Sequence, residues 1–290
     1  MSERTKGLVH GIIAYALWSV VAAYWKLLAH VSPIELLAHR ALWGLLAFLV
    51  LVALAKQLGA VREALRDVRV LGTSAISATL LTVNWGVFVW ATVRGHLLDA
   101  SLGYFINPLV SVALGTLLLR ERLSRLQWIA IMLAAAGVAL LTLRTGRAPW
   151  VALVLASSFG FYGLVRKTAK VDALVGSTVE TILIAPVALG YLLLTPGAFG
   201  HADISTHLLL AGTGLITAVP LVMFASSARR LPLSTLAFLQ YLTPTGQFLL
   251  AVLAFGEPVP LERLAAFVVI WIGLAVFSVD LWRRRLTVGP

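Results

Sequence analysis

Ten apolar stretches, each about as long as a membrane is thick, follow one another along almost the whole chain. They lie at residues 7–29, 33–55, 69–91, 98–119, 125–144, 149–168, 173–195, 207–227, 233–254 and 261–282. A helix that spans a bilayer needs about 20 mostly apolar residues, and a segment in hydrocarbon must satisfy its backbone hydrogen bonds internally. The pattern therefore predicts an all-α integral membrane protein with ten transmembrane helices, and it leaves too little chain for a soluble catalytic domain.

The composition agrees with this prediction and narrows the function. Hydrophobic residues make up 60% of the 290 residues and charged residues only 12%, whereas soluble domains contain about 25% charged residues. The chain has no Cys, and its six His form no HExxH motif, so we expect no thiol chemistry, no metal centre and no cofactor. A Walker motif is also absent from the sequence, so we do not expect ATP to be the energy source within this chain.

The net charge of +11 reflects membrane topology rather than nucleic-acid binding. If the N-terminus is cytoplasmic, 17 of the Lys and Arg residues fall in cytoplasmic segments, five fall on the opposite side and Arg40 lies within a span. Basic residues favour the cytoplasmic side of membrane proteins. We therefore expect both termini in the cytoplasm and no nucleic-acid partner.

The second half of the chain repeats the first at an offset of 136 residues, without a gap from 81–143 to 217–279. The register pairs Pro108 with Pro244, Glu121 with Glu257 and Gly137 with Gly273, and a looser match at an offset of 141 pairs Trp18 with Phe159. The alternative, chance likeness between apolar helices, accounts poorly for a Pro, a Glu and a Gly that match in one register.

The number of spans in each copy sets the orientation of the repeat. Five is an odd number, so the second copy crosses the membrane in the opposite sense to the first. We therefore predict two inverted five-helix repeats, at residues 1–145 and 146–290. This plan is typical of secondary transporters, whose binding site lies near the middle of the membrane between the repeats.

Two polar stripes at matching positions of the repeats give the candidate substrate site. Their members are Tyr104, Asn107, Pro108 and Ser111 in the fourth span, and Gln240, Thr243, Pro244 and Gln247 in the ninth, where Tyr241 is a further candidate. The spacing within each stripe places its members on one helical face, and each Pro frees the carbonyl four residues earlier. Such groups need protein partners or a wet cavity. We predict a cavity; contact between helices alone is the alternative.

Two charged residues inside spans are further candidates. Arg40 and Glu180 each lie about seven residues into a span, roughly 10 Å deep at 1.5 Å per residue. A charge at this depth often marks a substrate or proton path. We expect Arg40 to attract an anionic group, with snorkelling to the outer interface as the alternative, and Glu180 to carry a coupling proton.

Several uncharged residues complete the candidate set. Asn84 and Trp85, midway along the third span, are expected to hydrogen-bond and stack on a ligand, although a neighbouring helix is the alternative partner for Asn84. Tyr24 and Tyr162 are gating candidates together with the two prolines of the stripes, and an aromatic belt at the membrane interface is their alternative role.

Short motifs between residues 7 and 280 resemble those of a known family. They include SLGYFINPL at 101–109, FYGLVRK at 161–167, VPL at 219–221 and LSTL at 233–236. These motifs are similar to those of the RarD proteins, a branch of the EamA-type transporters in the drug/metabolite transporter superfamily. One departure is Arg120, where the family more often has Gly, and this difference argues against a tight turn there. The resemblance implies ten helices in two inverted repeats, alternating access, and a place in the bacterial inner membrane.

The sequence as a whole predicts a secondary active transporter, not an enzyme, that moves a small polar or amphipathic metabolite by alternating access. We expect this substrate to be amino acid-like or drug-like, and the other partners to be membrane lipids and protons. The sequence does not indicate an oligomeric state. A lipid-carrier flippase for polyprenyl phosphate, with the same fold, is the alternative. An intramembrane enzyme is the third class, and the sequence shows no nucleophile–base pair or metal cluster to support it.

Overall fold

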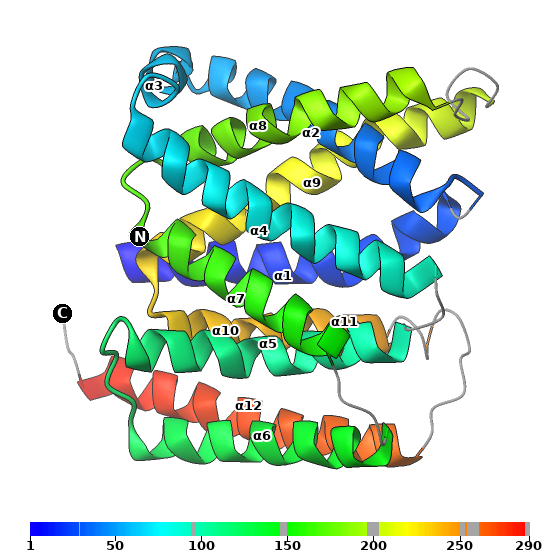
Figure 1. Ribbon diagram of the computed structural model, residues 1–290. Helices are drawn as coiled ribbons and strands as arrows, with labels where there is room; N and C mark the ends of the chain where they lie inside the picture. Colours follow the sequence, from blue (N-terminus) through cyan, green and yellow to red (C-terminus); the bar gives the residue numbers. More distant parts are fainter. Residues whose placement is uncertain are drawn as a thin grey trace.

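A computed structural model describes residues 1–28, 30–93, 97–145, 150–195, 203–249, 253 and 261–287. Within these ranges the chain forms helices and no strands (Figure 1). The helices are α1 (Glu3–Leu27), α2 (Pro33–Leu54), α3 (Leu58–Ala64), α4 (Val68–Val93), α5 (Leu97–Leu117), α6 (Arg125–Thr145), α7 (Trp150–Thr168), α8 (Ala173–Leu194), α9 (Ile204–Arg230), α10 (Leu233–Gln240), α11 (Leu242–Leu249) and α12 (Leu261–Thr287).

The all-α class predicted from the sequence is confirmed for the described residues. Each predicted span coincides with one helix, except that the ninth is divided into α10 and α11 and continues outside the described residues. The short helix α3 lies between the second and third predicted spans. Among the described residues, five helices are long and apolar enough to cross a membrane: α1, α2, α4, α8 and α9. The chain is therefore a multi-pass membrane protein, while the count of ten spans stays a prediction.

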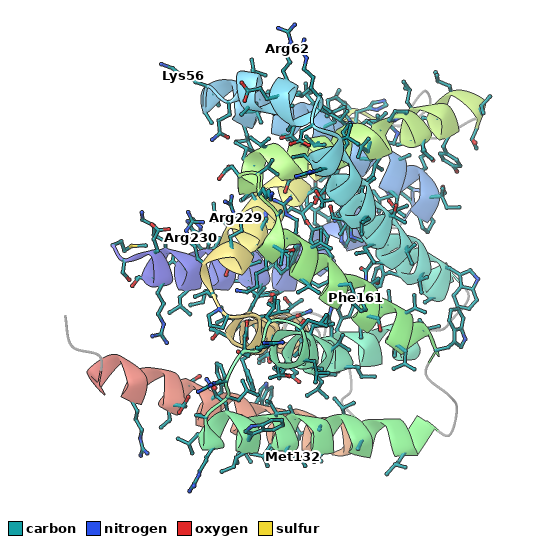
Figure 2. All side chains as sticks on the ribbon, turned by 60° about the vertical axis from the view of Figure 1, so that its left-hand side comes forward. Lys56, Arg62, Met132, Phe161, Arg229 and Arg230 are labelled. Atoms are coloured by element: carbon teal, nitrogen blue, oxygen red, sulfur yellow. The ribbon has the colours of Figure 1, made fainter. Side chains whose placement is uncertain are left out.

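The surface of the helices suits a lipid environment. Figure 2 shows Met132 and Phe161 on the outside of the molecule, where their side chains are 64% and 42% exposed. The beginning of α1 and the end of α12 lie at the same end of the molecule, where α3 also lies (Figure 1). An even number of crossings would produce this arrangement.

Polar caps fix where several helices begin. The Ser32 hydroxyl accepts a hydrogen bond from the Glu35 amide at the start of α2, and the Asp172 carboxylate accepts one from the Leu174 amide at the start of α8. These side chains replace helical partners that the first amides lack. Asp203 caps α9 in the same way. Hydrogen bonds from the side chain of Ser205, and then from Thr206, lower the pKa of Asp203 to about 2, so this cap is charged at neutral pH.

A tight turn after α5 brings the two halves of the sequence together. Arg120 has a φ of 54°, the left-handed region that costs a non-glycine residue about 1–2 kcal/mol. The turn is therefore formed despite the absence of Gly. It directs Glu121 to the start of α10, where Oε1 accepts from the Leu233 amide (2.6 Å) and Oε2 accepts from the Ser234 amide (3.0 Å) and hydroxyl (2.8 Å). A carboxylate at a helix N-terminus is stabilising. Glu257, the predicted counterpart of Glu121, lies outside the described residues.

The helices pack in a pattern that recurs between the two halves. Helices α1 and α2 of the first half both pack on α9 of the second half, and α7 and α8 of the second half both pack on α4 of the first. Likewise α5 packs on α7, while α10 and α11 pack on α1. Three further pairs, α2 with α8, α5 with α10 and α6 with α12, each join helices that the sequence repeat treats as equivalent. Figure 1 shows α6 and α12 side by side at one edge and α2 and α8 at the opposite edge.

Candidate functional site

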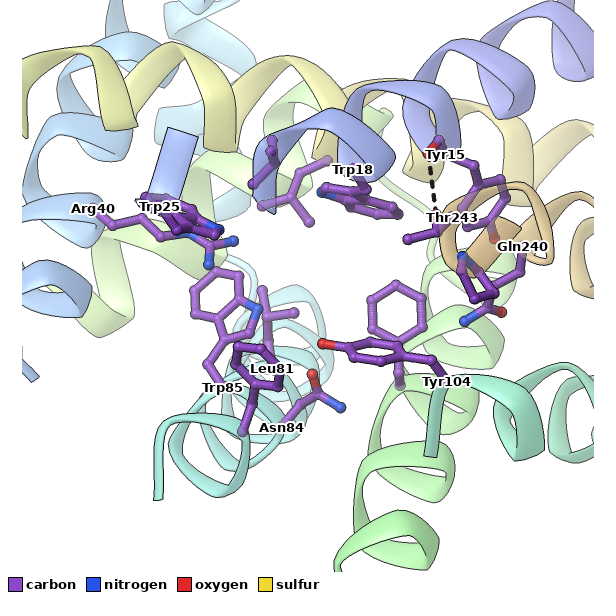
Figure 3. A pocket seen from close by; sticks show the side chains of 15 residues that line it. Tyr15, Trp18, Trp25, Arg40, Leu81, Asn84, Trp85, Tyr104, Gln240 and Thr243 are labelled. Atoms are coloured by element: carbon purple, nitrogen blue, oxygen red, sulfur yellow. Dashed lines mark hydrogen bonds between the residues drawn. The ribbon is translucent and has the colours of Figure 1, made fainter. Parts of the chain in front are cut away.

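A cavity of about 160 Å³ lies where the two halves of the sequence meet (Figure 3). The first half contributes side chains from α1, α2, α4 and α5 to its wall, and the second half contributes them from α7, α9, α10 and α11. The residues predicted from the sequence that the structure brings together here are Arg40, Asn84, Trp85, Tyr104, Gln240, Thr243 and Pro244. One member of the first stripe and three of the second thus reach the same space.

The remaining stripe residues lie away from the cavity wall. Asn107 and Ser111 are buried one and two turns further along α5, where the Ser111 hydroxyl lies 3.5 Å from Asn107 Oδ1. Pro108 lies inside the same helix. Tyr241 is buried between α10 and α11, and its hydroxyl donates to the Phe105 carbonyl oxygen (3.3 Å). The side chain of Gln247 lies outside the described residues.

The predicted gating tyrosines are held by other parts of the fold. The Tyr24 hydroxyl donates to the Leu209 carbonyl oxygen of α9 (2.5 Å). Tyr162 is fully buried and stacks on Phe224, with ring centroids 5.6 Å apart and planes 14° apart. Neither tyrosine lines the cavity.

Aromatic side chains that the sequence reasoning missed form much of the wall. They are Tyr15, Trp18, Trp25, Phe88 and Phe159. One signal did point to two of them, because Trp18 and Phe159 are matched in the repeat, and in the structure their rings meet edge to face at 5.7 Å. Aromatic rings present flat apolar surface and tolerate polar groups at their edges, so this wall suits an amphipathic ligand.

Arg40 brings a positive charge to this aromatic wall. Its guanidinium carbon lies 3.9 Å from the ring centroid of Trp85 and 5.6 Å from that of Trp25, and its Nε donates to Thr217 Oγ1 (2.8 Å). In the part of the chain that the structure describes, no carboxylate lies within 4.0 Å of this guanidinium. Contacts with indole rings stabilise a cation but leave its charge uncompensated. The arrangement can therefore bind an anionic group.

Amide and hydroxyl groups supply hydrogen bonds at other points of the wall. The Asn84 side-chain nitrogen donates to the Leu155 carbonyl oxygen (2.9 Å) and to Ser158 Oγ (2.9 Å), so its amide oxygen points the other way, to the cavity (Figure 3). Thr243 Oγ1 donates to the Tyr15 carbonyl oxygen (3.1 Å). Gln240 also lines the cavity, and among the described residues its side chain has no hydrogen-bond partner. The wall thus offers both an acceptor and a free amide.

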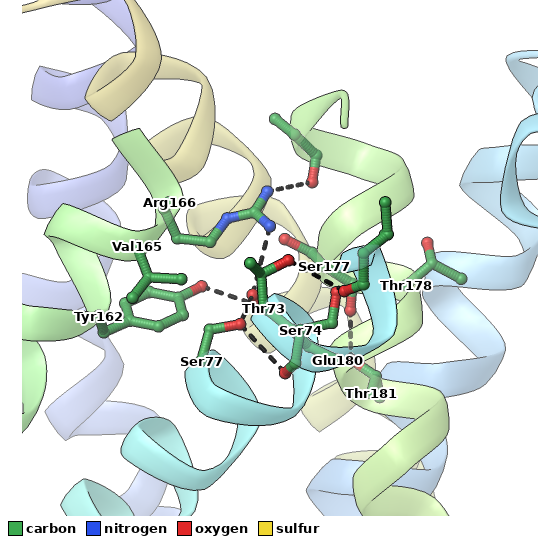
Figure 4. A network of polar contacts seen from close by, with 12 residues as sticks. Thr73, Ser74, Ser77, Tyr162, Val165, Arg166, Ser177, Thr178, Glu180 and Thr181 are labelled. Atoms are coloured by element: carbon green, nitrogen blue, oxygen red, sulfur yellow. Dashed lines mark hydrogen bonds and ion pairs between the residues drawn. The ribbon is translucent and has the colours of Figure 1, made fainter. Parts of the chain in front are cut away.

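Glu180 lies outside the cavity, in a buried polar network (Figure 4). Its Oε1 accepts hydrogen bonds from Ser77 Oγ (2.5 Å) and from Arg166 Nη1 (3.2 Å), and its Oε2 accepts one from the Tyr162 hydroxyl (3.3 Å). Both members of the Glu180–Arg166 ion pair are 2% exposed. Gly176 leaves the space that this pair needs, since a Cβ there would come within 2.2 Å of Arg166 Nη1. The network joins α4, α7 and α8.

Comparison with known proteins places the chain among bacterial membrane transporters. Residues 5–143 match the EamA-like transporter family. The chain is 44% identical to Protein RarD of Streptomyces exfoliatus (97% of this chain, 91% of that protein) and 41% identical to Protein RarD of Escherichia coli (98% of each). It is also 46% identical to an uncharacterized transporter of Pseudomonas aeruginosa (97% and 96%). A crystal structure with 23% identity superposes with a TM-score of 0.75 over 95% of this chain and 98% of that one, and so shares the fold.

We predict that removing one partner of the buried Glu180–Arg166 pair destabilises the fold more than removing both. Arg166→Leu leaves the Glu180 carboxylate buried without a cation and is expected to cost about 3–5 kcal/mol, whereas Arg166→Leu combined with Glu180→Leu regains most of this loss. Thermal unfolding of the purified variants measures the effect. Arg229→Leu is the control, because the Arg229–Asp172 pair is exposed and worth about 0–1 kcal/mol. A loss in the double variant as large as that in Arg166→Leu alone, or larger, contradicts this prediction.

Proposed function

Because the chain belongs to the RarD branch of the EamA-like transporter family, we propose that it is a secondary active transporter for a small metabolite with an anionic group. Family membership makes it a membrane transporter of the drug/metabolite class with a small-molecule substrate. The observation that carries the finer proposal is the Arg40 guanidinium, which faces an aromatic cavity without a carboxylate partner among the described residues. Since a buried charge without a partner is costly, a substrate anion would be held there.

The dimensions and walls of the cavity support a small amphipathic substrate. Drug-sized ligands occupy pockets of about 300–1,000 Å³, and this cavity of about 160 Å³ is smaller. The anionic end of the substrate would contact Arg40, its polar groups would meet Asn84, Tyr104 and Gln240, and its apolar body would lie against the rings. A metabolite about as large as an amino acid fits this description.

Alternating access would follow from two inverted repeats at residues 1–145 and 146–290. The recurring helix pairs support this proposal, because a pseudo-twofold axis would bring equivalent helices together and would repeat the contact of α1 with α9 in that of α7 with α4. The hydrogen bond from Tyr241 to Phe105 joins positions 136 residues apart, the offset of the sequence repeat. Both termini would then be cytoplasmic, in a bacterial inner membrane, with the cavity near the middle of the bilayer.

Glu180 is our candidate for proton coupling. Protonation would remove its charge and weaken the bond to Arg166, and this would loosen the contact between α4 of the first half and α7 and α8 of the second. Glu180→Gln removes the titratable group and retains the shape. If Glu180 couples transport to protons, uptake by this variant loses its pH dependence, whereas an unchanged pH profile rules Glu180 out.

We predict that Arg40 determines the preference for anions. Proteoliposomes with the purified chain should take up small labelled carboxylates, with benzoate and L-amino acids in the panel, faster than the corresponding amides. Hydrogen bonds to charged groups contribute about 1.5–3 kcal/mol, so Arg40→Gln should lower uptake of the preferred carboxylate at least about tenfold. Arg62→Gln, at an exposed position of α3, is the matched control and should behave as wild type.

Two outcomes would contradict this account of the site. Uptake by Arg40→Gln at the wild-type rate would remove Arg40 from substrate binding. Inhibition by a polyprenyl phosphate, with no uptake of any small carboxylate, would instead favour a lipid-carrier flippase.

A further inference from the structure

We propose that Thr217, which does not line the cavity, is a positioning residue for anion recognition: its hydroxyl selects which edge of the Arg40 guanidinium faces the substrate. This inference rests on the anion site proposed above. It adds a residue of the second half of the chain to a site where, among the described lining residues, the charge comes from Arg40 of the first half.

The contacts of Arg40 leave one edge of the guanidinium for a ligand. A guanidinium carries five N–H donors in a rigid plane, and it can hold a carboxylate either through Nε and one terminal nitrogen or through both terminal nitrogens. In this structure Nε is engaged by Thr217 Oγ1 and one face of the plane lies over the Trp85 ring. Figure 3 shows the end of the Arg40 side chain directed between Trp25 and Trp85 to the open space. A substrate anion would therefore be held end-on, by the two terminal nitrogens.

The packing of α9 against α2 fixes the position of the Thr217 hydroxyl. Thr217 is 4% exposed, and as a β-branched residue in a helix it has few rotamers. One turn earlier, a Cβ on Gly214 would come within 2.3 Å of the Trp43 carbonyl oxygen, so the two backbones are almost in contact. This close approach of α9 to α2 holds the Thr217 hydroxyl within hydrogen-bond distance of Arg40. A small shift of the hydroxyl would therefore tilt the guanidinium.

A similar contact between a hydroxyl and a charged side chain joins the two halves a second time. Arg40 and Glu180 each follow the N-cap of their helix, Ser32 or Asp172, by eight residues. Ser77 of α4 donates to Glu180 as Thr217 of α9 accepts from Arg40. Arg40 and Glu180 are therefore at matching positions, whereas the repeat register of 136 residues pairs Thr217 with Leu81, one helical turn from Ser77. A hydroxyl that orients a charge thus occurs twice, but Glu180 is neutralised by Arg166 whereas Arg40 faces the cavity.

Thr217→Val removes the hydroxyl and keeps the branched shape. The probes are benzoate, which carries one carboxylate on a flat ring, and benzamide, which has nearly the same shape without the charge. Calorimetric titration of the purified full chain should show that Thr217→Val weakens benzoate binding about tenfold, while benzamide binding stays within about twofold. Thr217→Ser retains the hydroxyl and should bind benzoate as the wild type does.

Thr213→Val is the matched control. Thr213 is buried on the same helix, and its hydroxyl donates to the carbonyl oxygen of Leu210 within that helix (2.5 Å), so its loss should leave the ratio of benzoate to benzamide affinity unchanged. Equal losses in Thr213→Val and Thr217→Val would show a merely structural effect and overturn the inference.

A further variant separates this inference from the proposed function. If Arg40→Gln abolishes the preference for benzoate and Thr217→Val does not change it, the anion site stands and the role of Thr217 is wrong. If the wild type shows no preference for benzoate, or Arg40→Gln retains that preference, the proposed anion site itself fails and the role of Thr217 fails with it.

Discussion

The proposed site depends on the contacts that position the Arg40 guanidinium. They come from the Thr217 hydroxyl and from the indole rings of Trp25 and Trp85. A charge removed from water needs a partner of opposite sign, or it destabilises the fold. Glu180 and Arg166 provide such partners for each other, at 3.2 Å and 2% exposure. Arg40 contacts Thr217, Trp25 and Trp85, and among the described residues no carboxylate lies within 4.0 Å of its guanidinium. Among the described residues, the buried Glu180 carboxylate is thus neutralised by Arg166, whereas the Arg40 charge is available to a ligand. This difference separates the structural ion pair from the proposed binding site.

The two halves of the chain are also joined at a helix terminus. The ninth predicted span is divided at Tyr241, close to Pro244, which lacks the amide that would bond to the Gln240 carbonyl. The first part of this span, α10, begins at the carboxylate of Glu121 from the first half. A movement of the turn that carries Glu121 would therefore act on α10, which ends at Gln240 in the cavity wall. The contact between Glu121 and α10 thus links the position of this turn to the position of Gln240 in the cavity wall.

Much of the fold, but only part of the site, follows from the sequence. Span length and apolar content predict where the helices lie, because a segment in hydrocarbon must satisfy its backbone hydrogen bonds internally. The depth of Arg40 within a span was enough to identify it as a candidate. The stripes were less informative, since a helical face gives a direction but not which of its turns reaches the cavity: Tyr104 does, whereas Asn107 and Ser111 do not. Trp25 was missed because an aromatic residue at this position also suits a core or a membrane interface. The pairing of Arg166 with Glu180 depends on how α7 and α8 both pack against α4, which residue types alone do not determine.

We propose that the cavity at Arg40 is the substrate site of an alternating-access transporter. The absence of Cys from the sequence allows one direct measurement: a single Gln240→Cys substitution, labelled with a membrane-impermeant maleimide added to one side or the other of sealed, oriented vesicles. We expect labelling from both sides, and protection from both sides by benzoate. Labelling that is confined to one side under every gradient, or that benzoate does not slow, would contradict this proposal.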